Sequence, residues 1–399
     1  MKLNTEKLPY IYDSLKENNI DAWLIVGRET QMRSEPVLPV LGDMAFIIAT
    51  SIIFTKEKCI AVVSPLDYQG FKLIEGIDEV IEYKGTMEET LADVLKDISP
   101  KKLALNYNSG DAASDGLTFG YYLLLQEVFK NIDFKGEIVS AFPIISKVRG
   151  IKTASQIEKI QVCVDKTQEY LNSVPEICYE DTTSLDIFEY LHKIAYDEGF
   201  GMSWADSQCP GVMVDPNVPA GHSGIIETPL VKGCVINIDY GLKKDGYVSD
   251  IQRMYYVLKD DETDAPEEVK RAFYTVRDAI LAAKEFIKPG VTGFQVDQVA
   301  RHLVVDMGYD SWNAALGHQI GHECHDGGTI LANRRARYNH THLIDTPLDK
   351  GNVFTLEPGI SIPQGRVGIE EDVVITETGC EFLSVPQQEL MLIRLKKRV

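Results

Sequence analysis

The chain has 399 residues, of which 44% are hydrophobic and 25% charged, and its formal net charge is −20. This length exceeds the size at which a single core stops growing, so we expect two domains, and the acidic balance without a Lys/Arg run argues against a nucleic-acid partner. No signal-peptide core is present at the N-terminus, and the longest apolar stretch, MAFIIATSIIF, is about half a membrane span, so we expect a cytoplasmic protein that does not bind a membrane.

Residues 1–148 alternate short β-branched runs with helical patterns, which predicts an α/β domain. The runs are AWLIV, AFIIATSIIF, CIAVVS and KLALNYN, and the helical patterns include MEETLADVLKDI and DGLTFGYYLLLQEVF. In residues 149–399 the pattern changes to helices, strands, helices and strands, and this order suggests a duplicated α+β domain. The expected helices cover 153–174, 182–200, 266–290 and 292–310.

The seven cysteines are scattered along the chain, and none forms a CxxC pair. Their number is odd, so a complete disulfide framework is not expected. We predict reduced thiols that lie mostly in the core.

Residues 222–241 and 340–359 match without gaps at a constant offset of 118. The two stretches read HSGIIETPLVKGCVINIDYG and HTHLIDTPLDKGNVFTLEPG, and nine of twenty positions are identical. Constant spacing is typical of a true repeat and predicts a duplicated fold with a pseudo-twofold axis.

Each copy runs into a predicted hairpin that carries two acids. We place the turns at residues 244–245 and 363–364, so that the acids of each hairpin are equally far from the turn and face each other across paired strands. The opposed pairs are Asp239 with Asp250 and Glu357 with Glu370.

The four acids point to metal ions. Single acids on half-exposed strands would be ordinary surface residues, but Asp239 and Glu357 lie in apolar runs, VINID and VFTLE, where an unpaired carboxylate is costly to bury. Four carboxylates carry more charge than one divalent ion needs, whereas two ions bridged by carboxylates would use it. Oxygen ligands with imidazole suit Mn, Co, Fe or Zn rather than a thiolate zinc site. We therefore expect a dinuclear centre.

The stretch GHQIGHECHD, residues 317–326, holds His318, His322 and His325. On a helix these three would share one face and could hold a single zinc ion. The two glycines of the stretch disfavour a helix, and on an extended chain His318 and His325 point to opposite faces. They would line one pocket only if the chain turns between them, for example at Gly321. For His322 we expect a hydrogen-bonded structural role.

IDYG, an Asp eleven residues later, GHxIGxxxHD, TLEPG and GIEED, in this order, resemble the metallopeptidase family of Xaa-Pro aminopeptidase, prolidase and methionine aminopeptidase. The resemblance covers about residues 150–390. It implies the creatinase-like pita-bread fold for residues 149–399, preceded by a creatinase-like α/β domain at 1–148. It also implies two divalent ions, Mn, Co, Zn or Fe with Mn favoured, and five ligands: Asp239, Asp250, His318, Glu357 and Glu370.

The same resemblance implies catalytic roles. A hydroxide shared by the two ions would attack the scissile carbonyl, and Glu357 would act as general base. His222 and His325 would contact the substrate and stabilise the tetrahedral intermediate. His340, the repeat mate of His222, and Arg366 are further candidates for substrate binding.

Two positions depart from the pattern of proline-specific members. Ala314 stands where a histidine is usual, and Gly368 where an arginine is usual, with Arg366 nearby but displaced. We expect hydrolysis of an N-terminal peptide bond in short peptides, as by an Xaa-Pro aminopeptidase or dipeptidase. The alternatives are a hydrolase or lyase that acts on a small non-peptide substrate, and a non-catalytic binding homologue. The resemblance also implies a homodimer.

Overall fold

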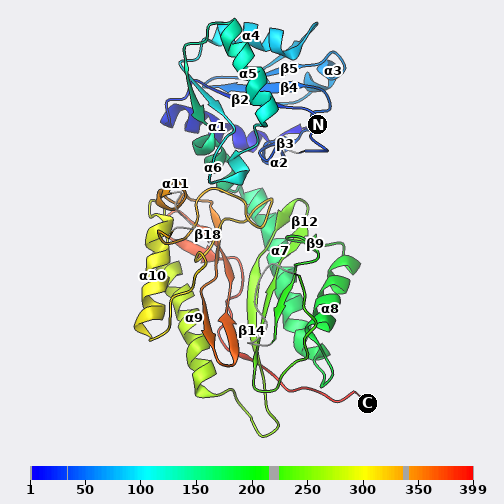
Figure 1. The fold of residues 1–399 in the computed structure, drawn as a ribbon, viewed down its shortest axis with the longest axis vertical. Coiled ribbons are helices and arrows are strands. Elements are labelled where there is room, and N and C mark those ends of the chain that lie inside the picture. Colours follow the sequence, from blue (N-terminus) through cyan, green and yellow to red (C-terminus); the bar gives the residue numbers. More distant parts are fainter. Residues whose placement is uncertain (1, 34, 215–223, 336–340, 399) are drawn as a thin grey trace. The chain divides into compact units, whose positions relative to one another are not determined.

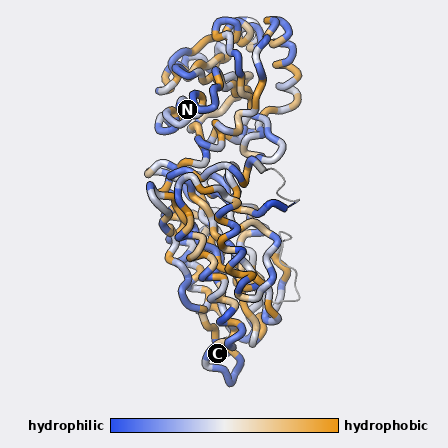
Figure 2. Tube along the Cα trace, turned by 90° about the vertical axis from the view of Figure 1, so that its left-hand side faces the viewer, coloured by the Kyte–Doolittle hydropathy of each residue, from blue (hydrophilic) through white to orange (hydrophobic). Residues whose placement is uncertain are grey.

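The computed structural model describes residues 2–33, 35–214, 224–335 and 341–398 (Figure 1). The chain forms two compact units, Met1–Gly150 and Ile151–Val399. In each unit the apolar segments run through the interior (Figure 2). Among the described helices, none combines the length and hydrophobicity needed to cross a bilayer.

Unit 1 is built around a six-stranded mixed sheet of order β6-β5-β4-β2-β7-β8. Strand β4 is antiparallel to both of its neighbours, and the other pairings are parallel. The elements of unit 1 are β1 (Lys2–Leu3), α1 (Leu8–Glu17), β2 (Ala22–Gly27), α2 (Leu38–Leu41), β3 (Gly42–Asp43), β4 (Thr50–Thr55), β5 (Cys59–Val63), α3 (Tyr68–Phe71), β6 (Glu79–Glu82), α4 (Met87–Ile98), β7 (Lys102–Leu105), α5 (Phe119–Asn131), β8 (Glu137–Ser140) and α6 (Phe142–Gly150).

Both faces of this sheet are covered, which is why its central strands read as continuous apolar runs. Trp23 and Ile25 pack with α1 and α6 on one face. Leu24 and Val26, one residue out of phase, pack with α4 and α5 on the other. The predicted helix MEETLADVLKDI coincides with α4, whose capping box begins at Thr86. The α/β prediction for this part of the chain is confirmed.

In its described residues, unit 2 contains two helix pairs and four small sheets, with strand orders β10-β11-β14-β20, β13-β12-β9, β15-β18-β19 and β16-β17. Its elements are α7 (Ala154–Ser173), α8 (Ser184–Asp197), β9 (Gly201–Met202), β10 (Gly211–Met213), β11 (Val235–Tyr240), β12 (Leu242–Lys244), β13 (Tyr247–Val248), β14 (Ile251–Val257), α9 (Glu267–Phe286), α10 (Gly293–Asp306), α11 (Thr341–Asp345), β15 (Val353–Leu356), β16 (Gly359–Ile362), β17 (Gly365–Gly368), β18 (Glu371–Ile375), β19 (Cys380–Phe382) and β20 (Met391–Ile393).

The two halves of unit 2 repeat the same local structure, as the sequence offset predicts. Helices α7 and α9 have 20 residues each, and α8 and α10 have 14. In each half the capping threonine of the shorter helix forms a β-bridge to the proline of the repeat, Thr183 to Pro229 and Thr292 to Pro347. The glycines that follow also correspond, with φ of +87° at Gly233 and +85° at Gly351.

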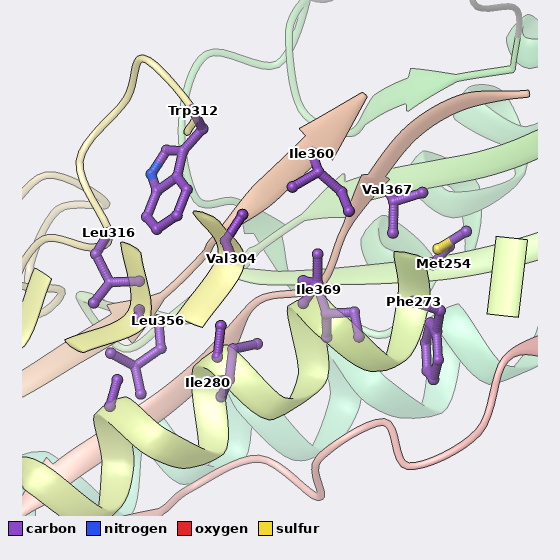
Figure 3. Close-up of a cluster of buried hydrophobic side chains, with 14 of the residues drawn as sticks. Met254, Phe273, Ile280, Val304, Trp312, Leu316, Leu356, Ile360, Val367 and Ile369 are labelled. Atoms are coloured by element: carbon purple, nitrogen blue, oxygen red, sulfur yellow. The ribbon is translucent and has the colours of Figure 1, made fainter. Parts of the chain in front are cut away.

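A large apolar core lies beneath the acidic strands of the second half. Figure 3 shows Leu356 and Ile369 among the side chains that pack with Ile280 of α9. Because side chains alternate along a strand, the residues that follow them, Glu357 and Glu370, point to the opposite face. Burial of each such Leu or Ile stabilises the fold by about 1.5–3 kcal/mol, which fixes the strands that carry the acids.

All seven cysteines are free thiols, and all except Cys234 are buried. The expectation that the cysteines lie mostly in the core is confirmed.

Candidate metal centre

Four acids and one histidine converge in unit 2 from five separate positions in the chain. Asp239 lies on β11, Asp250 directly precedes β14, Glu357 directly follows β15, and Glu370 directly precedes β18. His318 lies in the extended stretch 317–320, whose Gly317 and Gln319 form isolated bridges to Leu331 and Phe354. Residues 317–326 contain no helix, so the structure excludes the three-histidine helical face.

The register expected for the first hairpin was wrong by two residues. Asp239 pairs with Gln252, not with Asp250, and Lys244 pairs with Tyr247. The turn is therefore Asp245-Gly246, with φ of +50° and +76°. These angles suit a two-residue type I′ turn, for which Asp-Gly is a preferred sequence. A shift of two residues keeps every side chain on its face, so Asp250 still shares a face with Asp239.

The second hairpin has the expected register. Gly359 pairs with Gly368 and Ile362 with Gly365, which leaves Pro363-Gln364 as the turn. Beyond this ladder Leu356 pairs with Glu371 in the same register. Glu357 and Glu370 therefore stand opposite each other between the two ladders.

His318 lies between acids of both hairpins. Its Nε2 is 3.6 Å from Asp250 Oδ2 and 3.5 Å from Glu357 Oε1. Burial, and then the neighbouring His325, lower the pKa of His318 to about 3. The imidazole is therefore neutral, and these contacts are not ion pairs. A neutral imidazole that faces carboxylates is the form that binds a metal ion.

Burial shifts the pKa of three of the acids, Asp250, Glu357 and Glu370, upward. It raises the pKa of Asp250 and of Glu370 well above the ordinary carboxyl range, and nearby acids add to the effect. The pKa of Glu357 rises to about 8 through burial and the charge of Asp239, although the Arg366 charge and a hydrogen bond from Thr355 oppose the rise. Several carboxylates that repel one another in a buried site create a strong potential for cations.

The residues fit a divalent cation. One donor atom each from Asp250, His318 and Glu370 lie within 4.8 Å of one another. Within the described part of the chain, Asp250 Oδ1 and Glu370 Oε1 are buried and accept no hydrogen bond. A cation would satisfy both oxygens and relieve the repulsion among the acids.

Three supporting side chains were missed in the sequence. Gln252 donates to Glu370 Oε2 at 2.9 Å, and Asp372 Oδ2 accepts from the Asp250 backbone N–H at 3.2 Å. Cys324 Sγ donates to Asp250 Oδ2 at 3.0 Å. The Asp245-Gly246 dipeptide is a preferred hairpin turn. Placing the turn there in the sequence would have paired Gln252 with Asp239 and put both side chains on the same face. The contacts of Asp372 and Cys324 join distant segments and leave no local signal.

The chain turns between His318 and His325, as their shared pocket requires. Asp326 N–H donates to Gln319 O at 2.9 Å, which closes the turn. The rings of His318 and His325 lie 4.2 Å apart, and His325 is exposed. His322 instead packs against Tyr247, with the ring centroids 4.4 Å apart, which agrees with a structural role.

Arg366 lies close enough to Glu357 for its charge to lower the pKa of that carboxyl. A Cβ at Gly359 would be 3.0 Å from its guanidinium, and a Cβ at Gly368 would be 3.6 Å from its Nε. The missing side chain at Gly359 therefore leaves room for the Arg366 guanidinium, whereas a Cβ at Gly368 would only touch its Nε. Ala314 is half-buried against the apolar core. His222 and His340 lie outside the described residues.

The fold of the whole chain is that of known dipeptidases. It is similar to an Xaa-Pro dipeptidase from Bacillus anthracis, with a TM-score of 0.72, 23% identity, and coverage of 97% of this chain and 99% of that one. It is also similar to a prolidase from Pyrococcus horikoshii, with a TM-score of 0.69, 24% identity, and coverage of 97% and 100%. These matches confirm an α/β N-terminal domain followed by a pita-bread domain.

Comparison of sequences gives the family. The chain is 26% identical over 404 residues to the uncharacterized peptidase YqhT of Bacillus subtilis. This match covers 98% of this chain and 100% of the relative. It is 26% identical over 403 residues to an Xaa-Pro dipeptidase of Pyrococcus horikoshii, with the same coverage. The model of metallopeptidase family M24 matches residues 158–377. The chain therefore belongs to metallopeptidase family M24, and the resemblance drawn from its motifs is confirmed.

Proposed function

We propose that this chain is an Xaa-Pro dipeptidase-like enzyme that cleaves the N-terminal peptide bond of short peptides, and that residues 149–399 form its catalytic domain. The observation that carries this proposal is the convergence of His318 with Asp250 and Glu357, at 3.6 and 3.5 Å, in a buried acidic site. The Xaa-Pro dipeptidases among its relatives support the substrate class.

Two divalent ions would be held by the five converging residues. In this assignment Asp239 would hold one ion, His318 and Glu357 would hold the other, and Asp250 and Glu370 would contribute to both. When bound, the ions supply Lewis-acid activation of water and of the scissile carbonyl. Mn is our first choice, with Co, Zn or Fe as alternatives, because oxygen-rich sites with one imidazole suit these ions.

Glu357 is the proposed proton carrier. Its buried carboxyl has a pKa raised to about 8 before any cation binds, and bound cations would lower this pKa toward the working range of a general base. Glu357 would take the proton from the attacking water and deliver it to the leaving amine.

The histidines around the cluster are proposed to contact substrate. His325 is exposed and its ring lies 4.2 Å from that of His318. It can therefore contact a bound peptide from its present position next to the proposed metal ligand His318. With His222 it would donate hydrogen bonds to the oxygen that becomes negative in the transition state. His340 is proposed to line the same pocket.

Arg366 would favour dipeptides over longer peptides. Its guanidinium charge acts on Glu357, so it lies close to the reacting atoms. Its Nε is buried and has no hydrogen-bond partner in the described part of the chain. A guanidinium with an N–H that is not hydrogen-bonded suits a carboxylate. A dipeptide would supply this carboxylate, because its C-terminus lies one residue from the scissile bond.

A peptide panel tests the proposal. Protein loaded with Mn, Co or Zn is incubated with Xaa-Pro dipeptides, their C-terminal amides, Xaa-Pro tripeptides and matched non-proline dipeptides. We expect fastest cleavage of the free Xaa-Pro dipeptides. Faster turnover of a small non-peptide C–N or C–S compound would support the alternative substrate class, and the absence of peptide cleavage under all three metals would contradict the proposal. Bound metal near zero after gentle purification would favour a binding homologue.

We also propose a cytoplasmic homodimer. Sedimentation velocity of the full chain should give twice the mass of 44.6 kDa. A single monomer species over a wide concentration range would contradict this expectation.

A further inference from the structure

A second group of potential ligands overlaps the acidic centre. One donor atom each from His318, Cys324 and His325 lie within 4.8 Å of one another. The oxygen-rich group of Asp250, His318 and Glu370 meets the same criterion. The two groups share His318, and an imidazole ordinarily holds one metal ion. Occupation of one group therefore competes with occupation of the other.

The donor types of the two groups differ. A thiolate with two imidazoles suits Zn²⁺, Co²⁺ or Cd²⁺, whereas carboxylates suit Mn²⁺. A tetrahedral ion with bonds of about 2.0–2.3 Å needs donor atoms roughly 3.3–3.6 Å apart. The three donors, which lie within 4.8 Å of one another, would reach this spacing by side-chain rotation. His325 is exposed, so an ion can enter from solvent.

The turn that carries Cys324 and His325 is held in place. Lys152 Nζ and Asp326 Oδ2 are 3.1 Å apart, and their side chains are only 2% and 1% exposed. A Cβ at Gly321 would meet Asp326 Oδ2 at 2.1 Å, so only glycine permits this close packing. The backbone that carries two of the donors is thus held in place before an ion binds, which reduces the entropic cost of binding.

We propose that His318, Cys324 and His325 form an inhibitory site for a thiophilic divalent ion such as Zn²⁺. An ion there withdraws His318 from the acidic centre. It also removes the hydrogen bond that the Cys324 thiol donates to Asp250 Oδ2 at 3.0 Å. The inhibitory effect rests on the proposed peptidase function, whereas binding of the ion does not.

Cobalt binding tests the site without any activity measurement. The full chain is freed of metal and titrated with Co²⁺, and thiolate-to-cobalt charge-transfer absorption is recorded in the near ultraviolet. The test variant is Cys324→Ser, whose hydroxyl can still donate to Asp250. The matched control is Cys380→Ser, since Cys380 is 5% exposed against 6% for Cys324 and its thiol donates to a backbone carbonyl.

We expect the absorption in the wild type and in Cys380→Ser, its loss in Cys324→Ser, and its disappearance when Zn²⁺ displaces Co²⁺. Absorption that persists in Cys324→Ser, or never forms in the wild type, would overturn the proposal. If Cys324→Ser does not fold, Cys324→Ala replaces it with the same expectations.

The inhibition is measured on Mn-loaded protein, with each variant compared with its own rate before Zn²⁺ is added. Mutation of a residue that only orients a metal ligand already weakens metal binding by about 10–100-fold. Loss of the Cys324 ligand should therefore raise the Zn²⁺ concentration for half inhibition by about 10-fold or more, and Cys380→Ser should leave it unchanged. An unchanged value in Cys324→Ser would overturn the competition. If no peptide is cleaved at all, the proposed function fails, while the cobalt absorption still decides whether the site exists.

Discussion

Loss of Lys152 should destabilise unit 2 strongly. Lys152→Met removes the ammonium that lies 3.1 Å from Asp326 Oδ2 and leaves a carboxylate that is 1% exposed. Removal of one partner from a buried ion pair costs about 3–5 kcal/mol, because the other charge stays buried without its counter-charge. Asp326 Oδ1 keeps the hydrogen bond from the Glu323 N–H at 3.3 Å. Replacement of both charges, in Lys152→Met/Asp326→Leu, should recover most of this loss.

A second lysine provides a matched control. Lys243 Nζ also lies 3.1 Å from a carboxylate of the same loop, Glu323, but their side chains are 34% and 57% exposed. Lys243→Met should therefore cost less than about 1 kcal/mol. The two lysines differ mainly in burial, so their comparison isolates the cost of removing the counter-charge of a buried carboxylate.

The assay is urea unfolding of unit 2, followed by the fluorescence of Trp204 and Trp312 in a Trp23→Phe background, because Trp23 lies in unit 1. The free energy of unfolding comes from linear extrapolation. Equal losses for Lys152→Met and Lys243→Met, or a double variant as unstable as the sum of its single changes, would refute the reasoning.

Three further predictions follow from the site and from unit 1. Glu357→Ala should abolish peptide turnover, whereas His322→Ala should lower the melting temperature and keep turnover, since its ring packs on Tyr247; the reverse outcome in activity and melting assays would contradict the assignment. Arg366→Met should raise KM for Xaa-Pro dipeptides and leave KM for their C-terminal amides unchanged, and an equal rise for both would argue against carboxylate recognition. Burial raises the pKa of Glu35 from 4.5 to about 7, so its ionisation is harder in the folded state, and unit 1 should lose stability as pH rises from about 4.5 to 7. Glu35→Gln should remove this pH dependence in unfolding followed by Trp23, and an unchanged pH profile would show that Glu35 is not its source.

The sequence by itself determined the duplicated architecture and the positions of the acids. The offset of 118 reappears in the repeat-mate glycines and prolines of unit 2, because a duplicated segment keeps its own turns and caps. The second hairpin followed from symmetry about its turn. The first did not, because the Asp245-Gly246 turn, with its two positive φ angles, sets the register two residues away from the symmetric choice.

Only the tertiary structure decided how the stretch 317–326 is used. The spacing of His318 and His325 allowed either opposite faces or one pocket, and the choice depends on the turn closed at Gln319 and held by the buried Lys152–Asp326 pair. The contact of Cys324 with Asp250 joins residues 74 positions apart. Such contacts are set by how distant segments pack, and no local pattern of residues records them.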